Sequence, residues 1–119
     1  MKTLSYNLVK RNYSLENALF FIGNGNLNFG HKVVNFFNAK LSKCIISRFA
    51  DGEIKIQHIE ENVRNRDCII IQSTSGSSKY NPNDLIMEIF MLVDALKRAS
   101  SNSITLVLPI FPYQRQEKL

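Results

Sequence analysis

The segment from Cys68 to Phe111 restricts the fold more than any other part of this 119-residue chain. An apolar run, Cys68 to Gln72, is followed by a polar loop, a helical segment and a second apolar run, Ile104 to Phe111. Two strands joined through a helix form a βαβ crossover, in which the strands are parallel. The sequence therefore predicts an α/β domain with a parallel sheet, and we expect the strand Ile104 to Phe111 to be buried.

The helix between these strands has clear signals at its start. Asn81 suits the cap position, Pro82 the first helical position, and Asp84 adds a negative charge near the positive end of the helix dipole. The predicted helix continues to about Ser100 and has two apolar faces. The wide face consists of Leu85, Ile86, Ile89, Leu92, Val93 and Leu96, and the second of Met87, Phe90 and Met91. We expect the sheet to cover one face and a partner subunit to cover the other.

Upstream, the apolar pattern predicts three further strands and one helix. They are a buried strand at Ala18 to Ile22, a helix from about Leu27 to Asn38 capped by Asn26, a strand at Lys43 to Phe49 and a partly exposed strand at Ile54 to Ile59. The stripe Phe29, Val33, Phe36 and Phe37 is expected to be buried. We expect one domain, 18–119, preceded by an extension, 1–17. The first fifteen residues lack acids, so that a transit peptide is an alternative to a plain extension.

Fifteen basic and ten acidic residues give the chain a net charge of +5, which favours polyanionic partners such as nucleotide phosphates. The charges are dispersed, so we expect no nucleic-acid partner. No apolar run is long enough to span a membrane, and no membrane partner is expected. Cys44 and Cys68 lie in apolar contexts and predict free thiols in a reducing compartment, which points to the cytoplasm.

Two loops and two histidines each have an ordinary explanation when taken alone. Gly23-Asn24-Gly25-Asn26 follows a strand but lacks the third glycine of a dinucleotide fingerprint, since Asn28 occupies that position, so a tight turn is expected. The run from Ser73 to Ser78 would suit either a phosphate cradle or a solvated turn. His31 and His58 have no partners at metal-ligand spacing, so no metal site is predicted in this chain.

Two further segments have residue types that bind nucleotides. Phe49, Asp51 and Glu53 combine an aromatic ring, on which a base can stack, with carboxylates that can accept from an exocyclic amine. Arg115 to Lys118 follow a predicted strand end, where ligands bind in open α/β sheets, and their cations suit phosphate oxygens. A turn with a buried Phe, and an ordinary charged chain end, are the alternatives.

Taken together, five stretches in register resemble the N-terminal part of ribose-phosphate pyrophosphokinase, also called phosphoribosyl pyrophosphate synthetase. They cover Phe20 to Lys118. The stretches are Phe21 to Asn26, Arg48 to Ile54, Glu60 to Asp67, Ile70 to Ser75 with Met87 to Ile89 and Asp94 to Ser100, and Pro112 to Lys118.

The resemblance implies a phosphoribosyltransferase-like α/β domain, here incomplete, with a mostly parallel sheet flanked by helices. The family moves a pyrophosphoryl group from Mg-ATP to ribose 5-phosphate, giving phosphoribosyl pyrophosphate and AMP for nucleotide biosynthesis. By similarity, Phe49, Asp51 and Glu53 form an adenine pocket that is offered to a neighbouring subunit. Arg115 and Gln116 match an ATP-contacting pair, followed by Glu117 and Lys118. The family assembles as hexamers built from dimers.

Two substitutions and one absence depart from the family pattern. Gln114 stands where the family has a small Ala, which we expect to disturb packing beside Arg115, and Ala50 replaces a common Ser. The family's metal-associated histidine, its basic catalytic loop and its ribose-phosphate loop lie beyond the part matched here. We therefore expect no catalytic or metal-binding residue in this chain, Mg²⁺ to enter with ATP, and no synthetase activity from the chain alone. The alternative is a non-catalytic subunit that associates with full-length synthetase.

Overall fold

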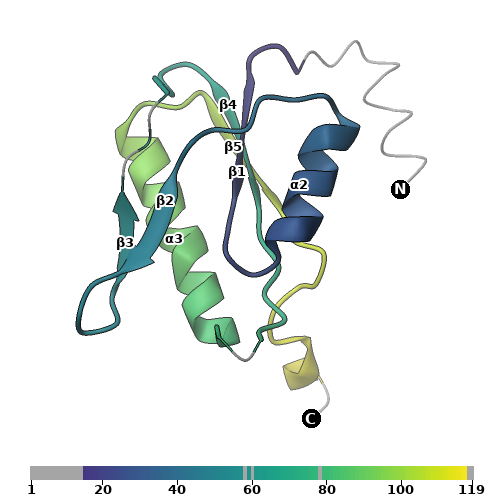
Figure 1. Cartoon of the computed structure of the whole chain (residues 1–119), viewed down its shortest axis with the longest axis vertical. Coiled ribbons are helices and arrows are strands. Elements are labelled where there is room, and N and C mark those ends of the chain that lie inside the picture. The colour runs from purple at the N-terminus through teal and green to yellow at the C-terminus, as the bar shows by residue number, and fades with distance from the viewer. Residues whose placement is uncertain (1–14, 58, 60, 78, 118–119) are drawn as a thin grey trace.

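A computed structural model of the chain describes residues 15–57, 59, 61–77 and 79–117. Residues 116 and 117 are described by their backbone alone. Three parallel strands form its central sheet (Figure 1). They are β1 (Ala18–Ile22), β4 (Asp67–Ile71) and β5 (Ser103–Val107), in the order β1-β4-β5. The helix α3 (Pro82–Arg98) joins β4 to β5, so the predicted βαβ crossover is confirmed. The first fourteen residues of the predicted extension lie outside the described residues.

A helix covers each face of the sheet, which gives the domain three layers (Figure 1). Side chains alternate along a strand, so β1 contributes to both layers. Leu19 and Phe21 belong to the cluster that includes Leu92 and Leu96 of α3. Phe20 points to the opposite face, where the cluster includes Val34 of α2 (Leu27–Phe36).

The strands β2 (Ile45–Arg48) and β3 (Ile54–Gln57) form a separate antiparallel hairpin. The hairpin lies beside α3, away from the edge strand β5 (Figure 1). Its inward residues Ile46 and Ile56 pack against the core cluster beneath α3. Both strands are shorter than the predicted Lys43 to Phe49 and Ile54 to Ile59, and residue 58 lies outside the described residues.

Both predicted helix caps are confirmed. The Asn26 side-chain oxygen accepts a hydrogen bond from the Phe29 amide at 3.0 Å, and that of Asn81 accepts one from the Asp84 amide at 2.9 Å. Each bond satisfies an amide that the first helical turn leaves without an intrahelical partner. The helices end earlier than expected, at Phe36 rather than Asn38 and at Arg98 rather than Ser100.

Polar side chains join the amino-terminal ends of β4 and β5. The Asp67 carboxylate accepts hydrogen bonds from the Asn102 amide group and the Ser103 hydroxyl, both at 2.7 Å, and a longer one from the Asn17 side chain. These hydrogen bonds stabilise the ionised carboxylate, with the largest effect from Asn102, then Ser103, and a smaller one from Asn17. The pKa of Asp67 therefore lies below its usual value. The carboxylate thus ties together segments that flank all three strands.

The strand β5 corrects one prediction. The segment from Ile104 to Phe111 was expected to form a buried strand, but β5 ends at Val107 and is largely exposed. Leu106, Ile110 and Phe111 all expose large parts of their side chains. The reason is position: β5 pairs only with β4 among the described strands, so it lies at the sheet edge.

One expected apolar surface also differs from prediction. Phe36 was assigned to the buried stripe of α2, but its side chain is 76% exposed. The buried positions of that helix are Gly30 and Val34, and Phe36 instead meets the edge of the Phe37 ring. On α3 the wide face is largely buried, as predicted, and Met87 and Phe90 of the second face, where a partner subunit is expected, are exposed in this single chain.

The two cysteines are free thiols, as predicted. Burial raises the pKa of both Cys44 and Cys68 to about 11, and the nearby Glu61 charge adds to the effect at Cys44. Both thiols therefore stay protonated at neutral pH. Within the described residues, no helix is long and apolar enough to cross a membrane.

Candidate functional site

The β2–β3 hairpin presents Phe49 at its tip, just after the last residue of β2. The phenyl ring is 49% exposed, and both Asp51 and Glu53 are exposed beside it. A turn with a buried Phe, the alternative considered for this segment, is therefore wrong. The three predicted residues lie together on one short loop, free to meet a ligand.

Backbone hydrogen bonds hold this loop in a defined shape. The Phe49 amide donates to the Glu53 carbonyl at 2.8 Å, and the Gly52 amide donates to the Phe49 carbonyl at 3.0 Å. The Asp51 carboxylate accepts from the Glu53 amide at 3.0 Å, so it has a role in the turn itself. The Lys55 ammonium lies 5.3 Å from the Phe49 ring centre, a cation–π contact that occupies one face of the ring.

The loop from Gly23 to Asn26 connects β1 to α2 and is held close to the segment that follows β4. A Cβ atom on Gly25 would overlap the carbonyl oxygen of Ser73, and one on Gly23 would overlap the Gln72 side chain. The Gly25 amide donates to the Gln72 side-chain oxygen at 3.0 Å. The glycines therefore do more than form the predicted tight turn, because they let two loops approach each other at the carboxyl ends of β1 and β4.

The loop after β4 was predicted as either a phosphate cradle or a solvated turn. Ser73 and Thr74 are buried, so the first part of the run is not solvated. The Thr74 hydroxyl donates to the Ile110 carbonyl at 3.1 Å, and the Ser73 and Ser75 hydroxyls lie 3.2 Å apart. Ser75 itself is exposed, and residue 78 lies outside the described residues.

A cavity of about 500 Å³ lies beyond the carboxyl ends of β4 and β5. Its walls combine hydroxyl, apolar and cationic groups, from Thr74, Ser75, Pro82, Ile110, Phe111, Pro112, Tyr113, Gln114 and Arg115. This is the edge at which open α/β sheets bind ligands. Two loops that are distant in sequence therefore bring a hydroxyl-bearing surface to the Arg115 guanidinium.

The structure describes the predicted ATP-binding residues at the end of the chain to different extents. Arg115 is exposed and lines the cavity, in the short 3₁₀ helix η1 (Gln114–Glu117). Gln116 and Glu117 belong to the same helix, of which only the backbone is described there, and Lys118 lies outside the described residues. Gln114 is exposed, so the expected disturbance of packing by this larger side chain does not occur.

The hairpin tip and η1 lie at separate corners of the domain (Figure 1). Phe49 and Arg115 are therefore not brought into one pocket by a single chain. The hairpin tip and η1 both lie at the end of the fold where the parallel strands have their carboxyl ends (Figure 1).

A buried cluster around Glu88 of α3 was missed by the sequence reasoning. Its carboxylate is 1% exposed and pairs with the Arg48 guanidinium at 2.9 Å. It also accepts from the Gln72 side chain and from both the backbone amide and the side chain of Asn24. The available signal was position, because Glu88 stands on the apolar stripe of α3, between Leu85 and Leu92 at spacings of three and four.

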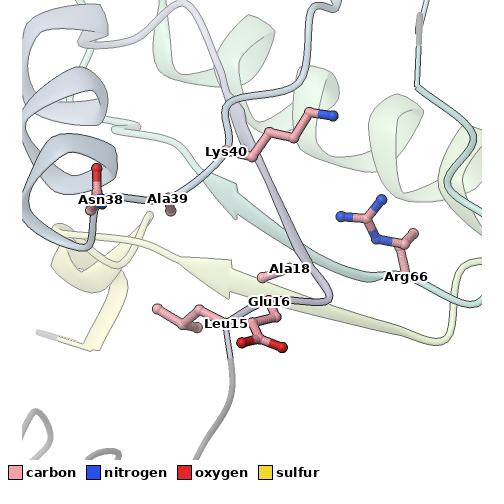
Figure 2. Close-up of a pocket in the computed structure, with 7 residues that line it drawn as sticks. All are labelled: Leu15, Glu16, Ala18, Asn38, Ala39, Lys40 and Arg66. Carbon is pink, nitrogen blue, oxygen red and sulfur yellow. The ribbon is translucent and has the colours of Figure 1, made fainter.

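A second cavity, of about 350 Å³, lies at the opposite end of the strands. Lys40 and Arg66 border it on one side, whereas the Glu16 carboxylate points away from them (Figure 2). The Arg66 guanidinium is engaged there, since its Nε donates to the Asn17 carbonyl at 2.9 Å. The amino-terminal ends of parallel strands are not where such sheets bind ligands, so we do not assign the site to this cavity.

The described residues contain no group of three or more His, Cys, Asp and Glu side chains that could hold a metal ion. His31 is exposed on α2, and His58 lies outside the described residues. The structure therefore shows no protein site for Mg²⁺ in the described part of the chain.

Comparison with known proteins identifies relatives of this chain. Residues 18–119 match the family model of the N-terminal domain of ribose phosphate pyrophosphokinase. The ribose-phosphate pyrophosphokinase of Burkholderia pseudomallei is 42% identical over 105 residues, which are 88% of this chain and 31% of the relative. That of Bacillus subtilis is 42% identical over 106 residues, 89% of this chain and 32% of the relative. The chain thus spans about a third of the length of the curated relatives it matches.

Solved structures agree with these relatives. Phosphoribosylpyrophosphate synthetase from Mycobacterium smegmatis superposes with a TM-score of 0.76 at 32% identity, covering 87% of this chain and 33% of that one. A purine phosphoribosyltransferase from Pyrococcus horikoshii superposes with a TM-score of 0.58 at 11% identity, covering 89% and 66%. This second likeness concerns the fold alone, and it supports the predicted phosphoribosyltransferase-like domain.

Proposed function

The chain belongs to the ribose-phosphate pyrophosphokinase family, and from this premise we propose that it binds Mg-ATP for pyrophosphoryl transfer to ribose 5-phosphate. The products of that reaction are phosphoribosyl pyrophosphate and AMP, so the bond that breaks lies between the α- and β-phosphates of ATP. Because the chain corresponds to about a third of its relatives, its proposed share is nucleotide binding.

The observation that carries this proposal is the cavity beyond β4 and β5. There the Arg115 guanidinium lies at one wall, and the exposed Ser75 lies at another. Phosphoryl transfer depends mainly on positioning and on neutralising charge on the phosphates. A guanidinium presents several N–H donors in a fixed fork, which matches phosphate oxygens well. Gln116, Glu117 and Lys118 are proposed to complete this phosphate-facing segment.

The hairpin supplies the proposed base-binding part. Phe49 is exposed and held by its backbone, so a purine can stack on the ring face that Lys55 does not occupy. Glu53 has an exposed carboxylate that can accept from the exocyclic amine of adenine, and Asp51 shapes the loop. Since the hairpin and η1 lie apart in one chain, we propose that the hairpin serves the phosphate cavity of a second copy, within a hexamer built from dimers.

The metal is proposed to arrive with the nucleotide. The described residues build no carboxylate or histidine cluster, so they do not fit a resident Mg²⁺ ion. In the Mg-ATP complex the phosphates themselves hold the ion, and Arg115 would neutralise the charge that remains.

Nucleotide binding can be tested with the 119-residue chain by calorimetry with Mg-ATP, at protein concentrations where sedimentation shows association. Phe49→Ala should weaken binding by roughly 5- to 150-fold, since stacking on an aromatic ring contributes about 1–3 kcal/mol per base. Phe36→Ala is the matched control, because Phe36 is also an exposed phenyl ring but lies on α2. Equal affinity in the wild type and Phe49→Ala, or no saturable binding by the wild type, would contradict the proposal.

The reaction itself is tested by AMP release from Mg-ATP and ribose 5-phosphate. We expect no turnover from this chain alone, because it corresponds to only about a third of the length of its relatives. Turnover above background would show that the chain contains catalytic groups that we have not assigned.

A second candidate function is association with complete synthetase subunits, as a non-catalytic partner. The observation that favours it is the outer face of α3, where Met87 and Phe90 are 46% and 61% exposed. Exposed apolar side chains of this size favour a protein partner. Co-purification with a full-length synthetase, lost in Phe90→Glu, would support this function, and the absence of a mixed complex would exclude it.

A further inference from the structure

The Glu88 carboxylate sits where three segments meet, which are the loop after β1, the end of β2 and the segment after β4. Its Oε1 accepts hydrogen bonds from the Asn24 amide at 3.0 Å and the Gln72 side chain at 2.9 Å. Its Oε2 accepts from the Asn24 side chain at 3.0 Å and from Arg48 at 2.9 Å. Four donors, two to each oxygen, surround a side chain that is almost fully buried.

Two of the partners of Glu88, Gln72 and Asn24, use both hydrogens of their side-chain amide groups. The Gln72 amide group donates its second hydrogen to the Leu85 carbonyl at 3.1 Å, and its oxygen accepts from Gly25. The Asn24 side chain donates its second hydrogen to the Ile46 carbonyl of β2 at 3.1 Å. A fully satisfied buried network of this kind has one arrangement, and partial loss of it is costly.

The network reaches the hairpin at two points. Ile46 accepts from Asn24, and Arg48, the last residue of β2, pairs with Glu88. Arg48 is the residue directly before Phe49, and its guanidinium also lies 5.2 Å from the Tyr80 ring centre. Among the described strands, the hairpin shares no hydrogen-bonded ladder with the central sheet, so these contacts and its apolar packing hold its position.

We propose that Glu88 is a positioning residue, which sets the hairpin and its Phe49 ring relative to the loops at the carboxyl ends of β1 and β4. The effect of Glu88 on nucleotide binding acts through Arg48, and this part of the inference rests on the proposed function. The effect of Glu88 on the position of the hairpin is independent of the proposed function.

A carboxylate suits this role, and an amide does not. In Glu88→Gln one of the two oxygens becomes an NH₂ group, which would face two donors rather than accept from them. Either the pair from Asn24 and Arg48 or the pair from Asn24 and Gln72 must then separate. The Arg48 side chain is 23% exposed, so it can turn to solvent and leave the hairpin without its tether.

The test compares amide hydrogen exchange of the hairpin with that of the core, in the whole chain. We expect Glu88→Gln to speed exchange at the Phe49 and Gly52 amides by about 10-fold or more beyond any change at Ile70 of β4, because hydrogen bonds to charged groups are the strong ones. Asp94→Asn is the matched control, since it removes an equally short ion pair with Arg98 from the exposed side of the same helix. It should change neither set of amides.

Arg48 variants keep the test decisive if Glu88→Gln does not fold. Arg48→Met leaves Glu88 with its three other donors, and removes the ion pair next to Phe49 together with the contact of Arg48 with the Tyr80 ring. It should speed hairpin exchange while leaving the Ile70 amide unchanged, and Arg48→Lys, which keeps a cation, should lie between Arg48→Met and wild type. A merely structural Glu88 would instead lower protection equally in hairpin and core, and that outcome would overturn the proposal.

Mg-ATP affinity of the folded variants separates this inference from the proposed function. If the wild type binds Mg-ATP, Glu88→Gln and Arg48→Met should weaken binding by about 10-fold or more, whereas Asp94→Asn should not. If no protein binds Mg-ATP but the hairpin alone loses protection, the proposed function fails and the positioning role stands. If Mg-ATP binds and neither hairpin exchange nor affinity responds to Glu88→Gln or Arg48→Met, the positioning role is wrong.

Discussion

The close approach of the loop at Gly25 to Ser73 leads to a quantitative prediction for Gly25→Ala. The added Cβ atom would overlap the Ser73 carbonyl oxygen and lie 2.9 Å from the Ser73 carbonyl carbon. Both atoms belong to the backbone, so they cannot rotate away as a side chain would. The loop from Gly23 to Asn26 must therefore move.

The cost follows from the hydrogen bonds that this movement breaks. The Gly25 amide would lose its bond to Gln72, worth about 1 kcal/mol, and the Asn24 amide its bond to the Glu88 carboxylate, worth about 2 kcal/mol because the acceptor is charged. We therefore expect Gly25→Ala to lower the free energy of unfolding by about 3 kcal/mol. For a domain of this size, the melting temperature would fall by roughly 10–20 °C.

The measurement is urea unfolding followed by far-ultraviolet circular dichroism, repeated at several protein concentrations. Gly52→Ala is the control, because no atom lies within 4 Å of its added Cβ, although its φ of 95° makes alanine strained there by about 1 kcal/mol. Both Gly→Ala changes lower the conformational entropy of the unfolded chain by a similar amount, so this contribution to the free energy of unfolding cancels when the two variants are compared. If Gly25→Ala costs no more than Gly52→Ala, the close approach is not rigid and the reasoning is wrong.

Three other variants probe the core, the acid response and the phosphate cavity. Leu92→Ala should lower the free energy of unfolding in urea by about 2–5 kcal/mol, because Leu92 is buried against the sheet. Met87→Ala, on the exposed face of α3, should lower it by less than about 1 kcal/mol, and equal losses would contradict the assigned faces. Because the pKa of Asp67 is lowered by folding, its ionised carboxylate stabilises the fold above the carboxyl pKa of the unfolded chain, and this stabilisation is lost as pH falls through the lower folded value. Asp67→Asn should therefore flatten the fall in the free energy of unfolding below about pH 5. Parallel curves of stability against pH for wild type and variant would refute this. Arg115→Ala should weaken Mg-ATP binding and reduce its dependence on salt, measured by titration at several ionic strengths, while Lys97→Ala, at the end of α3, should do neither.

Features that depend on neighbouring residues in sequence were predicted well. The cap of α3 follows from Asn81, Pro82 and Asp84 alone, and the structure shows the expected hydrogen bond. The βαβ crossover also follows from the order of local elements, since a helix between two strands leaves little choice but a parallel pair. The predicted binding residues Phe49 and Arg115 are both exposed.

Features that depend on the assembly of distant segments were not predicted. The exposure of β5 depends on which strand lies beyond it, and the apolar run from Ile104 to Phe111 does not specify that neighbour. The burial of Glu88 depends on Arg48, Asn24 and Gln72, which come from three other segments. A single acidic residue in a helix suggests a solvated position, and only its place on the apolar stripe indicated otherwise.

The strand order β1-β4-β5 has a consequence for how the chain folds as it is made. Among the described strands, β1 pairs only with β4. The residues that meet beside this pair, Asn17 and Asp67, are 50 positions apart, whereas Asp67 and Ser103, at the β4–β5 end, are 36 apart. Pairing at such separations is slow, because the intervening chain must first be closed into a loop. On the ribosome, β1 must therefore wait without its neighbouring strand until β4 has left the exit tunnel, with only the bridge to Leu41 available earlier. This interval is when the newly made chain is most open to aggregation and to binding by chaperones.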